Sequence, residues 1–418
     1  MPAASTIRDL SLAPEGERKI EWVAIHSHTL NALKRSRLDD GSLRGRRIAL
    51  AIHLEAKTAY LAWLFQEAGA EVTVTGSNPF STQDDVAAAL VKRGLRVHAL
   101  HGVDAATFDR HLLQTLDSRP EVSVDAGAAL VARLHQHRPQ LLPGVRGASE
   151  ETTSGIIRLQ AMQREGALKI PVIAANNARC KQLFDNRYGT GQSTLTAVMS
   201  ATNLLIAGKT TVVAGYGWTG RGLAFYARGF GARVTVVEVD PVKALEALAD
   251  GFAVMSLAEA APLGDLFLTA TGSIGVLRRE HFQRMKNGAL LANAGNYAHE
   301  IDVPALRQLA REQREVRRHV TEYVLRDGRR LHLLAQGALV NIVASDGHPI
   351  EIMDLSFSVQ ALAVHYLAQH ADELKPGVVP LPDEIDFAIA RTRLELLGVQ
   401  LEKPTTEQQA YQQSWREP

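Results

Sequence analysis

Short apolar runs alternate with amphipathic stretches through the first part of the chain. Residues 58–70 and 84–94 carry apolar side chains at helical spacing, and each stretch lies between two compact apolar runs. The apolar runs predict strands at residues 46–54, 70–78, 96–102 and 170–176. Strands that alternate with helices in this way are typical of a parallel sheet covered by helices.

The second part of the chain repeats this alternation. Residues 194–208 predict a helix that leads into it, and residues 221–231 predict a helix between two strands. The expected strands are residues 210–215, 233–240, 265–271, 289–295 and 329–337. A last helix is expected at residues 383–398, before a polar tail. The pattern therefore predicts an α/β fold with two doubly wound parallel sheets and a short helical C-terminal tail.

Composition narrows the class of protein without identifying it. The 418 residues are enough for two or three domains, and 46 basic residues nearly balance 45 acidic ones. This balance argues against a nucleic-acid or membrane partner. Cys180 is the single cysteine, which excludes an internal disulfide and favours a reducing compartment. With no signal-like or membrane-spanning apolar segment, we expect a cytoplasmic enzyme, and we expect no metal site.

The stretch VVAGYGWTGRGLA carries the clearest motif. Gly215, Gly217 and Gly220 have the G-x-G-x-x-G spacing between a predicted strand and a predicted helix. The glycines allow a tight turn, the approach of a pyrophosphate, and close packing of helix on strand. Glu238, at the end of the next strand, is placed to accept the ribose hydroxyls and favours NAD over NADP, although Lys243 nearby could tolerate a phosphate. The alternative is a purely structural turn.

Several polar segments are too specific for ordinary loops. They include RPQLLPGVRG (138–147), SEETTSG (149–155), FDNRYG (184–189), RGFGARV (228–234) and GHP (347–349). Through these segments the chain resembles the S-adenosylhomocysteine hydrolase family from about residue 51 to residue 409. The resemblance implies a substrate-binding domain at 1–190 plus 348–382, a Rossmann NAD-binding domain at 191–347, and a tail at 383–418. It also implies a homo-oligomer, either tetramer or dimer, and a small-molecule nucleoside substrate.

The chemistry implied by the family uses NAD as a catalyst. The substrate's ribose 3′-hydroxyl is oxidised, which acidifies the C4′ hydrogen so that a base can remove it. The C5′ substituent then leaves by elimination, water adds, and the ketone is reduced again. No net oxidation results, so the cofactor stays bound.

Four residues match the catalytic positions of the family. Lys181 and Asp185 match the pair at the 3′-hydroxyl, although their spacing also suits a plain helix ion pair. Glu151 matches the carboxylate that binds the ribose hydroxyls, the alternative being a helix-capping acid. His53 matches the histidine near the C5′ leaving group, the alternative being a structural histidine.

The resemblance also assigns contacts around these four residues. The expected substrate contacts are Glu55, Lys57, Asn78, Thr82, Gln83, Asn176, Asn296, Asp346, His348 and Met353. The expected cofactor contacts are Thr152, Thr153, Ser154, Asn186, Gly215, Gly217, Trp218, Thr219, Gly220, Glu238, Lys243, Thr271, Gly272, Asn293 and Asn341. Within these sets, His348 matches a gate histidine between the two domains, and Asn186 and Asn341 match amides near the nicotinamide.

The departures from the family pattern gather on the substrate side. The family's adenine-reading H-M-T-x-E-T is HLEAKT here, which puts Glu55 and Lys57 in the threonine and glutamate positions. Ala126 stands where an aspartate is expected, Asn296 replaces a histidine, and Asp346 replaces an apolar residue. The family's C-terminal K-P-D-H-Y-R-Y is absent, and we therefore expect weaker retention of NAD. Because lysine only donates hydrogen bonds, the recognised base edge should change.

These departures leave three functions open. The first is the family's redox cycle on a modified nucleoside, with a nucleoside dehydratase of natural-product metabolism as one concrete form. His53 would then handle both the C4′ and the leaving-group protons, since Ala126 cannot. The second is ordinary hydrolysis of S-adenosylhomocysteine. The third is a non-catalytic homologue that binds NAD or a nucleoside and regulates a partner.

Overall fold

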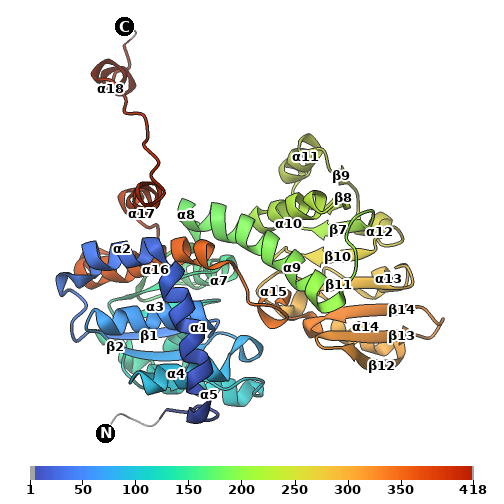
Figure 1. Cartoon of the computed structure of the whole chain (residues 1–418), viewed down its shortest axis with the longest axis horizontal. Coiled ribbons are helices and arrows are strands. Elements are labelled where there is room, and N and C mark those ends of the chain that lie inside the picture. Colours follow the sequence, from blue (N-terminus) through green and yellow to red (C-terminus); the bar gives the residue numbers. More distant parts are fainter. Residues whose placement is uncertain (1–4, 417–418) are drawn as a thin grey trace.

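The computed structural model describes residues 5–416. Figure 1 shows two α/β units side by side, with the helix α9 (Thr190–Thr202) running from the first unit into the second. The chain returns to the first unit through α16 (Ile350–His370), so that this unit is built from both ends of the sequence. Within the described residues, no helix combines the length and the apolar character needed to cross a membrane.

The first unit is built on a seven-stranded parallel sheet with the order β15-β6-β5-β4-β1-β2-β3. Its strands are β1 (Arg47–Ile52), β2 (Glu71–Gly76), β3 (Arg96–His98), β4 (Val122–Asp125), β5 (Gly147–Glu150), β6 (Pro171–Ile173) and β15 (Gly377–Val379). Its helices, besides α16, are α1 (Ala13–His26), α2 (His28–Arg37), α3 (Ala56–Glu67), α4 (Asp84–Lys92), α5 (Ala105–Leu116), α6 (Ala129–His137), α7 (Thr153–Arg164), α8 (Arg179–Lys181) and α17 (Asp383–Leu396).

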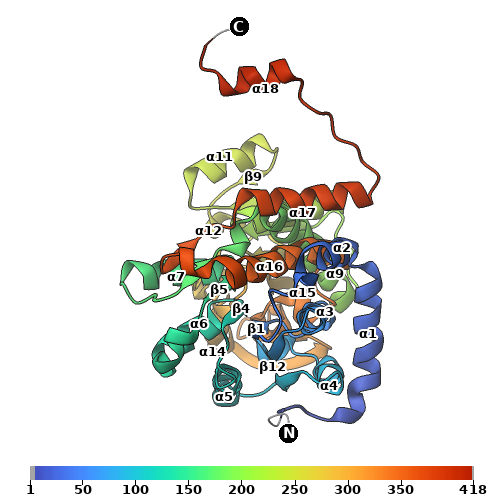
Figure 2. The same cartoon turned by 90° about the vertical axis from the view of Figure 1, so that its left-hand side faces the viewer.

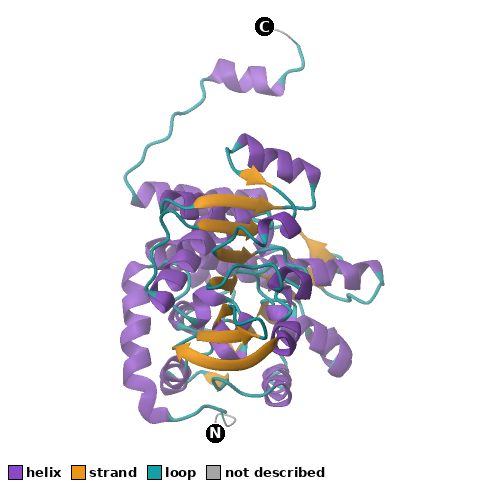
Figure 3. Ribbon diagram, turned by 90° about the vertical axis from the view of Figure 1, so that its right-hand side faces the viewer, coloured by secondary structure: helices purple, strands orange, loops and turns teal. Residues whose placement is uncertain are grey.

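The second unit is built on an eight-stranded sheet with the order β12-β13-β14-β11-β10-β7-β8-β9, and Figure 3 shows its strands stacked between helices. Its strands are β7 (Thr210–Ala214), β8 (Arg233–Val237), β9 (Ala253–Val254), β10 (Leu266–Thr269), β11 (Ala289–Asn293), β12 (Ala310–Arg317), β13 (Val320–Leu325) and β14 (Arg330–Leu334). Its helices, after α9, are α10 (Trp218–Gly229), α11 (Pro241–Ala249), α12 (Leu257–Ala260), α13 (Arg279–Phe282), α14 (Val303–Leu309) and α15 (Val340–Val343).

The predicted α/β class and the two sheets are confirmed, with two corrections. The second sheet is mixed, because β13 pairs antiparallel with both β12 and β14. The sequence AREQREVR of β12 is almost entirely exposed and polar, so it lacks the alternation that marks a half-buried strand. The polar segment 149–155, for which we predicted no strand or helix, overlaps the end of the fully buried strand β5 and the start of α7.

The C-terminal segment does not lie apart from the body as a whole. Its helix α17 packs on α2 and α16, and Asp386 accepts hydrogen bonds from the backbone N–H groups of Arg179 (2.6 Å) and Cys180 (3.0 Å). This carboxylate fixes the start of α8, the short helix that carries Lys181. Only the stretch beyond α17 stands away from both units in Figure 2, ending in α18 (Thr406–Gln413).

The strand order of each sheet reverses direction at one point. In the first sheet the reversal falls between β4 and β1, and in the second it falls between β10 and β7. In open parallel sheets, ligands bind beyond the carboxyl ends of the strands at such a reversal. We therefore expect chemistry at residues that directly follow β1, β4 and β5 in one unit, and β7 and β10 in the other.

The helix α16 ties the N-terminal helices to the first sheet through a buried carboxylate. Asp354 accepts hydrogen bonds from the backbone N–H groups of Thr29 (2.9 Å) and Leu30 (2.8 Å) in the first turn of α2. Without this side chain both N–H groups would be buried and unpaired, which costs about 1–3 kcal/mol for each group.

We predict that Asp354→Ala lowers the free energy of unfolding by about 2 kcal/mol or more, as measured by urea denaturation. Asp372→Ala is the control, because Asp372 is exposed and pairs with Arg146 at the surface, where ion pairs contribute little. Equal stability of the two variants would contradict the capping role.

Candidate active site

Two buried carboxylates shape the edge of the first sheet where β4 and β5 end. Glu150 accepts hydrogen bonds from the backbone N–H groups of Gly127 (2.9 Å) and Ala128 (2.8 Å), and Asp125 accepts from that of Ala129 (2.9 Å). Burial, together with the charge of Asp125, raises the pKa of Glu150 to about 8. These contacts fix the loop that contains Ala126.

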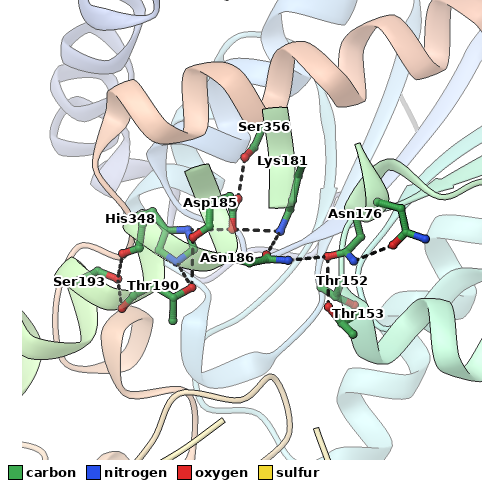
Figure 4. A network of polar contacts seen from close by, with 12 residues as sticks. Thr152, Thr153, Asn176, Lys181, Asp185, Asn186, Thr190, Ser193, His348 and Ser356 are labelled. Atoms are coloured by element: carbon green, nitrogen blue, oxygen red, sulfur yellow. Dashed lines mark hydrogen bonds and ion pairs between the residues drawn. The ribbon is translucent and has the colours of Figure 1, made fainter. Parts of the chain in front are cut away.

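Lys181 and Asp185 lie in a buried network of polar side chains, shown in Figure 4. The Lys181 Nζ atom donates to Asp185 Oδ1 (3.0 Å) and to Asn186 Oδ1 (2.7 Å). Residues 182–189 form a π-helical segment, a geometry found frequently at functional sites. The two charges are an i, i+4 pair, yet their burial and shared partners distinguish them from a surface helix ion pair.

Asp185 is held from three sides. Ser356 of α16 donates to its Oδ2 atom (2.7 Å), and the Nδ1 atom of His348 lies 3.4 Å from its Oδ1 atom. Burial acts to raise the pKa of Asp185, but the charges of Lys181 and His348 and the hydrogen bonds hold it well below the ordinary value. The carboxylate therefore stays ionised, and it can steady a neighbouring cation or accept a hydroxyl proton in a hydrogen bond.

The network continues from Asn186 to the start of α7. The side-chain N–H of Asn186 donates to Asn176 Oδ1 (3.1 Å), and the Thr153 hydroxyl donates to the same oxygen (3.3 Å). His348 reaches the other end through Thr190 (3.1 Å). The structure thus brings together six of the predicted residues, from Thr153 to His348, in one network.

Glu151 lies beside this network but takes part in none of its hydrogen bonds. The side chain is buried, and its carboxylate makes no hydrogen bond to protein within residues 5–416. Burial raises its pKa to about 8, with Asp185 and Glu55 acting in the same direction and Lys181 opposing. Thr152, not Glu151, caps α7, so the capping alternative for Glu151 is wrong. A buried carboxyl group with free acceptors suits a polar ligand.

His53 directly follows β1, and His348, Asp185 and Lys181 are among its charged neighbours. Its Nδ1 atom forms a hydrogen bond with the Ser81 hydroxyl (2.7 Å). Burial and the neighbouring His348 lower its pKa to about 4, while hydrogen bonding with Asn296 and the charge of Asp185 act in the opposite direction. The imidazole is therefore neutral at physiological pH, with one ring nitrogen able to accept a proton.

Glu55 and Lys57 form a buried ion pair at the start of α3. The Lys57 Nζ atom lies 2.7 Å from Glu55 Oε2 and donates to the backbone oxygen of Asp346 (2.8 Å). Glu55 also caps α3 by accepting from the backbone N–H groups of Lys57 and Thr58. The two departures from the family pattern at residues 55 and 57 are thus in direct contact, and Lys57 also contacts the backbone of a further departure, Asp346.

The neighbouring predicted substrate contacts have structural partners of their own. Asn78 caps the turn Pro79–Ser81, Thr82 donates to the Asn78 backbone oxygen (3.3 Å), and the backbone N–H of Gln83 donates to Leu54 (2.8 Å). Met353 is buried in α16. The first three residues thus stabilise the turn that follows β2, and Met353 belongs to the packing of α16.

Asn296 and Tyr297 connect the second unit to the first. The Asn296 side chain donates to the Ser154 hydroxyl (3.1 Å), and the Tyr297 hydroxyl donates to the backbone oxygen of Gly127 (3.2 Å). Ser154 also shares a hydrogen bond with Thr152 (3.3 Å). Two adjacent residues after β11 therefore close over the loop that follows β4.

The glycine-rich turn after β7 has the shape required by a dinucleotide. Gly215 has a φ of +99°, and a Cβ there would lie 2.7 Å from the Ala270 backbone oxygen. A Cβ at Gly217 would meet nothing within 4 Å, so this position is open to a ligand at the start of α10. Glu238 accepts from the backbone N–H of Tyr216 (2.7 Å), which places the carboxylate beside the turn.

The remaining predicted cofactor contacts lie in three places: after β10 and β11, at Asn341, and around the start of α10 and α11. Thr271 and Gly272 follow β10 and are held by the Glu300 carboxylate, and Asn293 bridges the backbone of its own loop. Asn341 donates to Ser193 (2.9 Å), while its Oδ1 atom is buried without a partner among residues 5–416, as expected of a group that awaits a ligand amide. Farther out, Trp218 and Thr219 begin α10, and Lys243 pairs with Asp240 (3.2 Å). These features fit NAD.

Several functional contacts were missed from the sequence. Ser81, Glu150, Glu300 and Ser356 each orient a predicted site residue or its loop. Glu150 stands beside Glu151 in SEETTSG and was readable as a second acid in the motif. Ser356 lies in an apolar helix and carried no local signal. Within the described residues, no cluster of three metal-ligating side chains occurs.

The fold and the site define a two-domain enzyme of the NAD-dependent class. Family profiles match residues 4–138, as S-adenosyl-L-homocysteine hydrolase, and residues 186–347, as its NAD-binding domain. An adenosylhomocysteinase of Pyrococcus abyssi is 52% identical over 410 residues, covering 98% of this chain and 97% of that protein. An S-inosyl-L-homocysteine hydrolase of Methanocaldococcus jannaschii is 49% identical over 411 residues, covering 98% and 99%. The chain belongs to the S-adenosyl-L-homocysteine hydrolase family, and its cofactor is NAD.

We predict that Glu151→Gln stabilises the protein at high pH. A carboxyl group whose pKa is raised by folding costs no stability below its unfolded value near 4.5, and this cost grows until the pH passes about 8. Urea unfolding should therefore show Glu151→Gln to be more stable than the wild type by on the order of 1 kcal/mol or more at pH 8, and by much less at pH 5.

The control is Glu165→Gln, which changes an exposed carboxylate at the C-terminal end of α7. Its stability should stay within about 0.5 kcal/mol of the wild type at both pH values. A pH-independent effect of Glu151→Gln would contradict the raised pKa.

Proposed function

We propose that this protein hydrolyses the thioether bond between homocysteine and C5′ of a purine nucleoside. The supporting observations are the family membership and the buried Lys181–Asp185–Asn186 network at the junction of the two units. Bound NAD supplies a reversible acceptor for the hydride at C3′ of the ribose.

Lys181 is the group we assign to the 3′-hydroxyl proton. Its ammonium is buried between Asp185 and Asn186, and in the neutral form the same Nζ atom can accept a proton from a hydroxyl placed beside it. Asp185 remains charged and orients the amine. Glu151, with free carboxyl oxygens, binds the ribose hydroxyls in this proposal.

His53 is the group we assign to proton transfer at C4′ and C5′. Since Ala126 has no acid–base group, a single imidazole must serve both atoms. In the elimination the C4′–H and C5′–S bonds break and a C4′–C5′ double bond forms, while His53 takes the C4′ proton and passes it to the sulfur. In the addition of water, His53 takes a proton from the water and returns it to C4′. The protons balance in both steps.

The base that fits residues 55 and 57 best is a 6-oxopurine. Relative to the family pattern, a hydroxyl that can donate is replaced by the Glu55 carboxylate, which only accepts, and a carboxylate is replaced by the Lys57 ammonium, which only donates. Adenine presents an N6 donor and an N1 acceptor, whereas hypoxanthine presents an O6 acceptor and an N1–H donor. Both replacements therefore invert hydrogen-bonding polarity in the sense that hypoxanthine requires, which favours S-inosylhomocysteine.

Hydrolysis of S-adenosylhomocysteine is the second candidate, and it is favoured by the name of the Pyrococcus abyssi relative. The dehydratase that the sequence left open has no support among the relatives, which are named as hydrolases or adenosylhomocysteinases. A purely regulatory homologue would not need the buried Lys181–Asp185 pair, because keeping charges away from water is costly.

We predict that the enzyme prefers S-inosylhomocysteine to S-adenosylhomocysteine by about 5-fold to 150-fold in kcat/KM. A donor–acceptor mismatch at a buried base edge costs roughly 1–3 kcal/mol, which corresponds to that ratio. The measurement is the release of free homocysteine thiol from each substrate. The double variant Glu55→Thr/Lys57→Glu should reverse the preference.

The control for this pair is Lys92→Glu, which makes the same charge change at an exposed position of α4 and should leave the preference unaltered. A preference of wild type for S-adenosylhomocysteine would refute the 6-oxopurine assignment while leaving the hydrolysis itself intact. Release of thiol from neither substrate would refute the proposed hydrolysis.

We predict that Lys181→Gln slows the oxidation of a bound nucleoside by at least about 100-fold, because general-base assistance at the 3′-hydroxyl is lost. The measurement is the rise of near-ultraviolet NADH absorbance when inosine or adenosine is added to the NAD-loaded enzyme. An unchanged rate would show that Lys181 takes no part in this proton transfer.

A further inference from the structure

Ser81 occupies the turn between β2 and α4 and contacts His53 across 28 positions of sequence. Its hydroxyl lies 2.7 Å from His53 Nδ1 and 3.0 Å from the backbone oxygen of Asn78. Ser81 is buried, and the turn that carries it is capped by the Asn78 side chain, which accepts from the backbone N–H of Phe80 (2.9 Å). The hydroxyl is therefore fixed in position by the local chain.

The two contacts of Ser81 determine which ring nitrogen of His53 carries hydrogen. A carbonyl oxygen can only accept, so the single hydroxyl hydrogen of Ser81 is directed to Asn78. The Ser81 oxygen is then left to accept from His53, which requires a hydrogen on Nδ1. In the neutral ring the lone pair consequently lies on Nε2.

Charged groups of the candidate active site lie near the His53 ring. The titratable and charged groups that act on His53 are His348 before α16, Lys181 in α8 and Asp185 in the π-helical segment, and Asn296 offers it a hydrogen bond from the second unit. The Asn296 amide nitrogen donates to Ser154 (3.1 Å), and its amide oxygen can accept from a protonated His53, in agreement with the upward effect of Asn296 on the His53 pKa. A proton on Nε2 thus has a partner when His53 becomes charged.

We propose that Ser81 is a positioning residue that keeps His53 protonated at Nδ1, so that Nε2 is the atom that accepts and returns protons. The inference rests on the proposed function for its kinetic consequences, but the tautomer itself does not depend on substrate. The tautomer of His53 is decisive because Ala126 provides no alternative base. The contact with Ser81 is therefore important for the reaction. A ring with its hydrogen on Nε2 would present a donor where an acceptor is required.

The direct test is the tautomer of His53, observed by nitrogen-15 NMR of histidine-labelled, NAD-loaded protein and assigned with His53→Gln. In wild type we expect a neutral ring with Nδ1–H. In Ser81→Ala we expect a mixture or the Nε2–H form, and in Ser81→Thr, which keeps the hydroxyl, we expect Nδ1–H again. Nδ1–H in Ser81→Ala, or Nε2–H in wild type, would overturn the proposal.

The kinetic test separates the two halves of the reaction. Ser81→Ala should lower the release of homocysteine by about tenfold or more and shift the acidic limb of its pH profile, and Ser81→Thr should recover most of the rate. The oxidation half, followed as NADH absorbance with inosine, should change less than about twofold. Equal losses in both halves would indicate a general structural effect and overturn the positioning role.

Ser358→Ala is the control for loss of a buried hydroxyl. Ser358 is fully buried in α16 and donates to the Asp354 backbone oxygen (2.6 Å), remote from His53. In Ser358→Ala, the NMR signal of the His53 tautomer and the ratio of the two half-reaction rates should match those of the wild type. If wild type itself shows neither NADH formation nor homocysteine release, the proposed function fails, and the NMR result still decides the tautomer.

Discussion

The buried ion pair between Lys181 and Asp185 is the interaction on which the rest of the site depends. Burying two charges costs free energy unless polar partners replace the lost water. Asn186, His348 and Ser356 are such partners, and they come from three different elements. Those partners come from the π-helical segment, from the return to the first unit, and from α16. The need to satisfy one pair thus fixes the junction at which the chain passes from one unit to the other.

Around this pair, the site is built from groups whose protonation is set by burial. A raised pKa favours the neutral form of Glu151, whereas Asp185 stays ionised and His53 stays neutral. All three lie in the same small region. Groups with separated pKa values can divide the roles of acid, base and electrostatic anchor. Glu55 and Lys57 pair with each other, Lys57 also contacts the Asp346 backbone, and neither side chain hydrogen-bonds to these three side chains in the described residues.

Much of the fold was readable from the chain because its strands are short apolar runs and its helices are amphipathic. The strand β12 and the strand β5 were not readable, since one is polar on nearly every position and the other is buried while carrying serine and glutamate. In both cases pairing with neighbouring strands, rather than side-chain pattern, makes the strand. The motif residues were found because glycine geometry and the family segments are local in sequence.

The sequence by itself determined the α/β class and the dinucleotide turn, because these follow from local spacing, and the family segments supplied the candidate site residues. Only the tertiary structure decided how those residues are arranged and which groups they contact. It paired Glu55 with Lys57, left the Glu151 carboxyl without a protein partner, and set Ser81 against His53. Burial and hydrogen-bond direction arise from elements distant in sequence, and they determine which atom donates and which accepts.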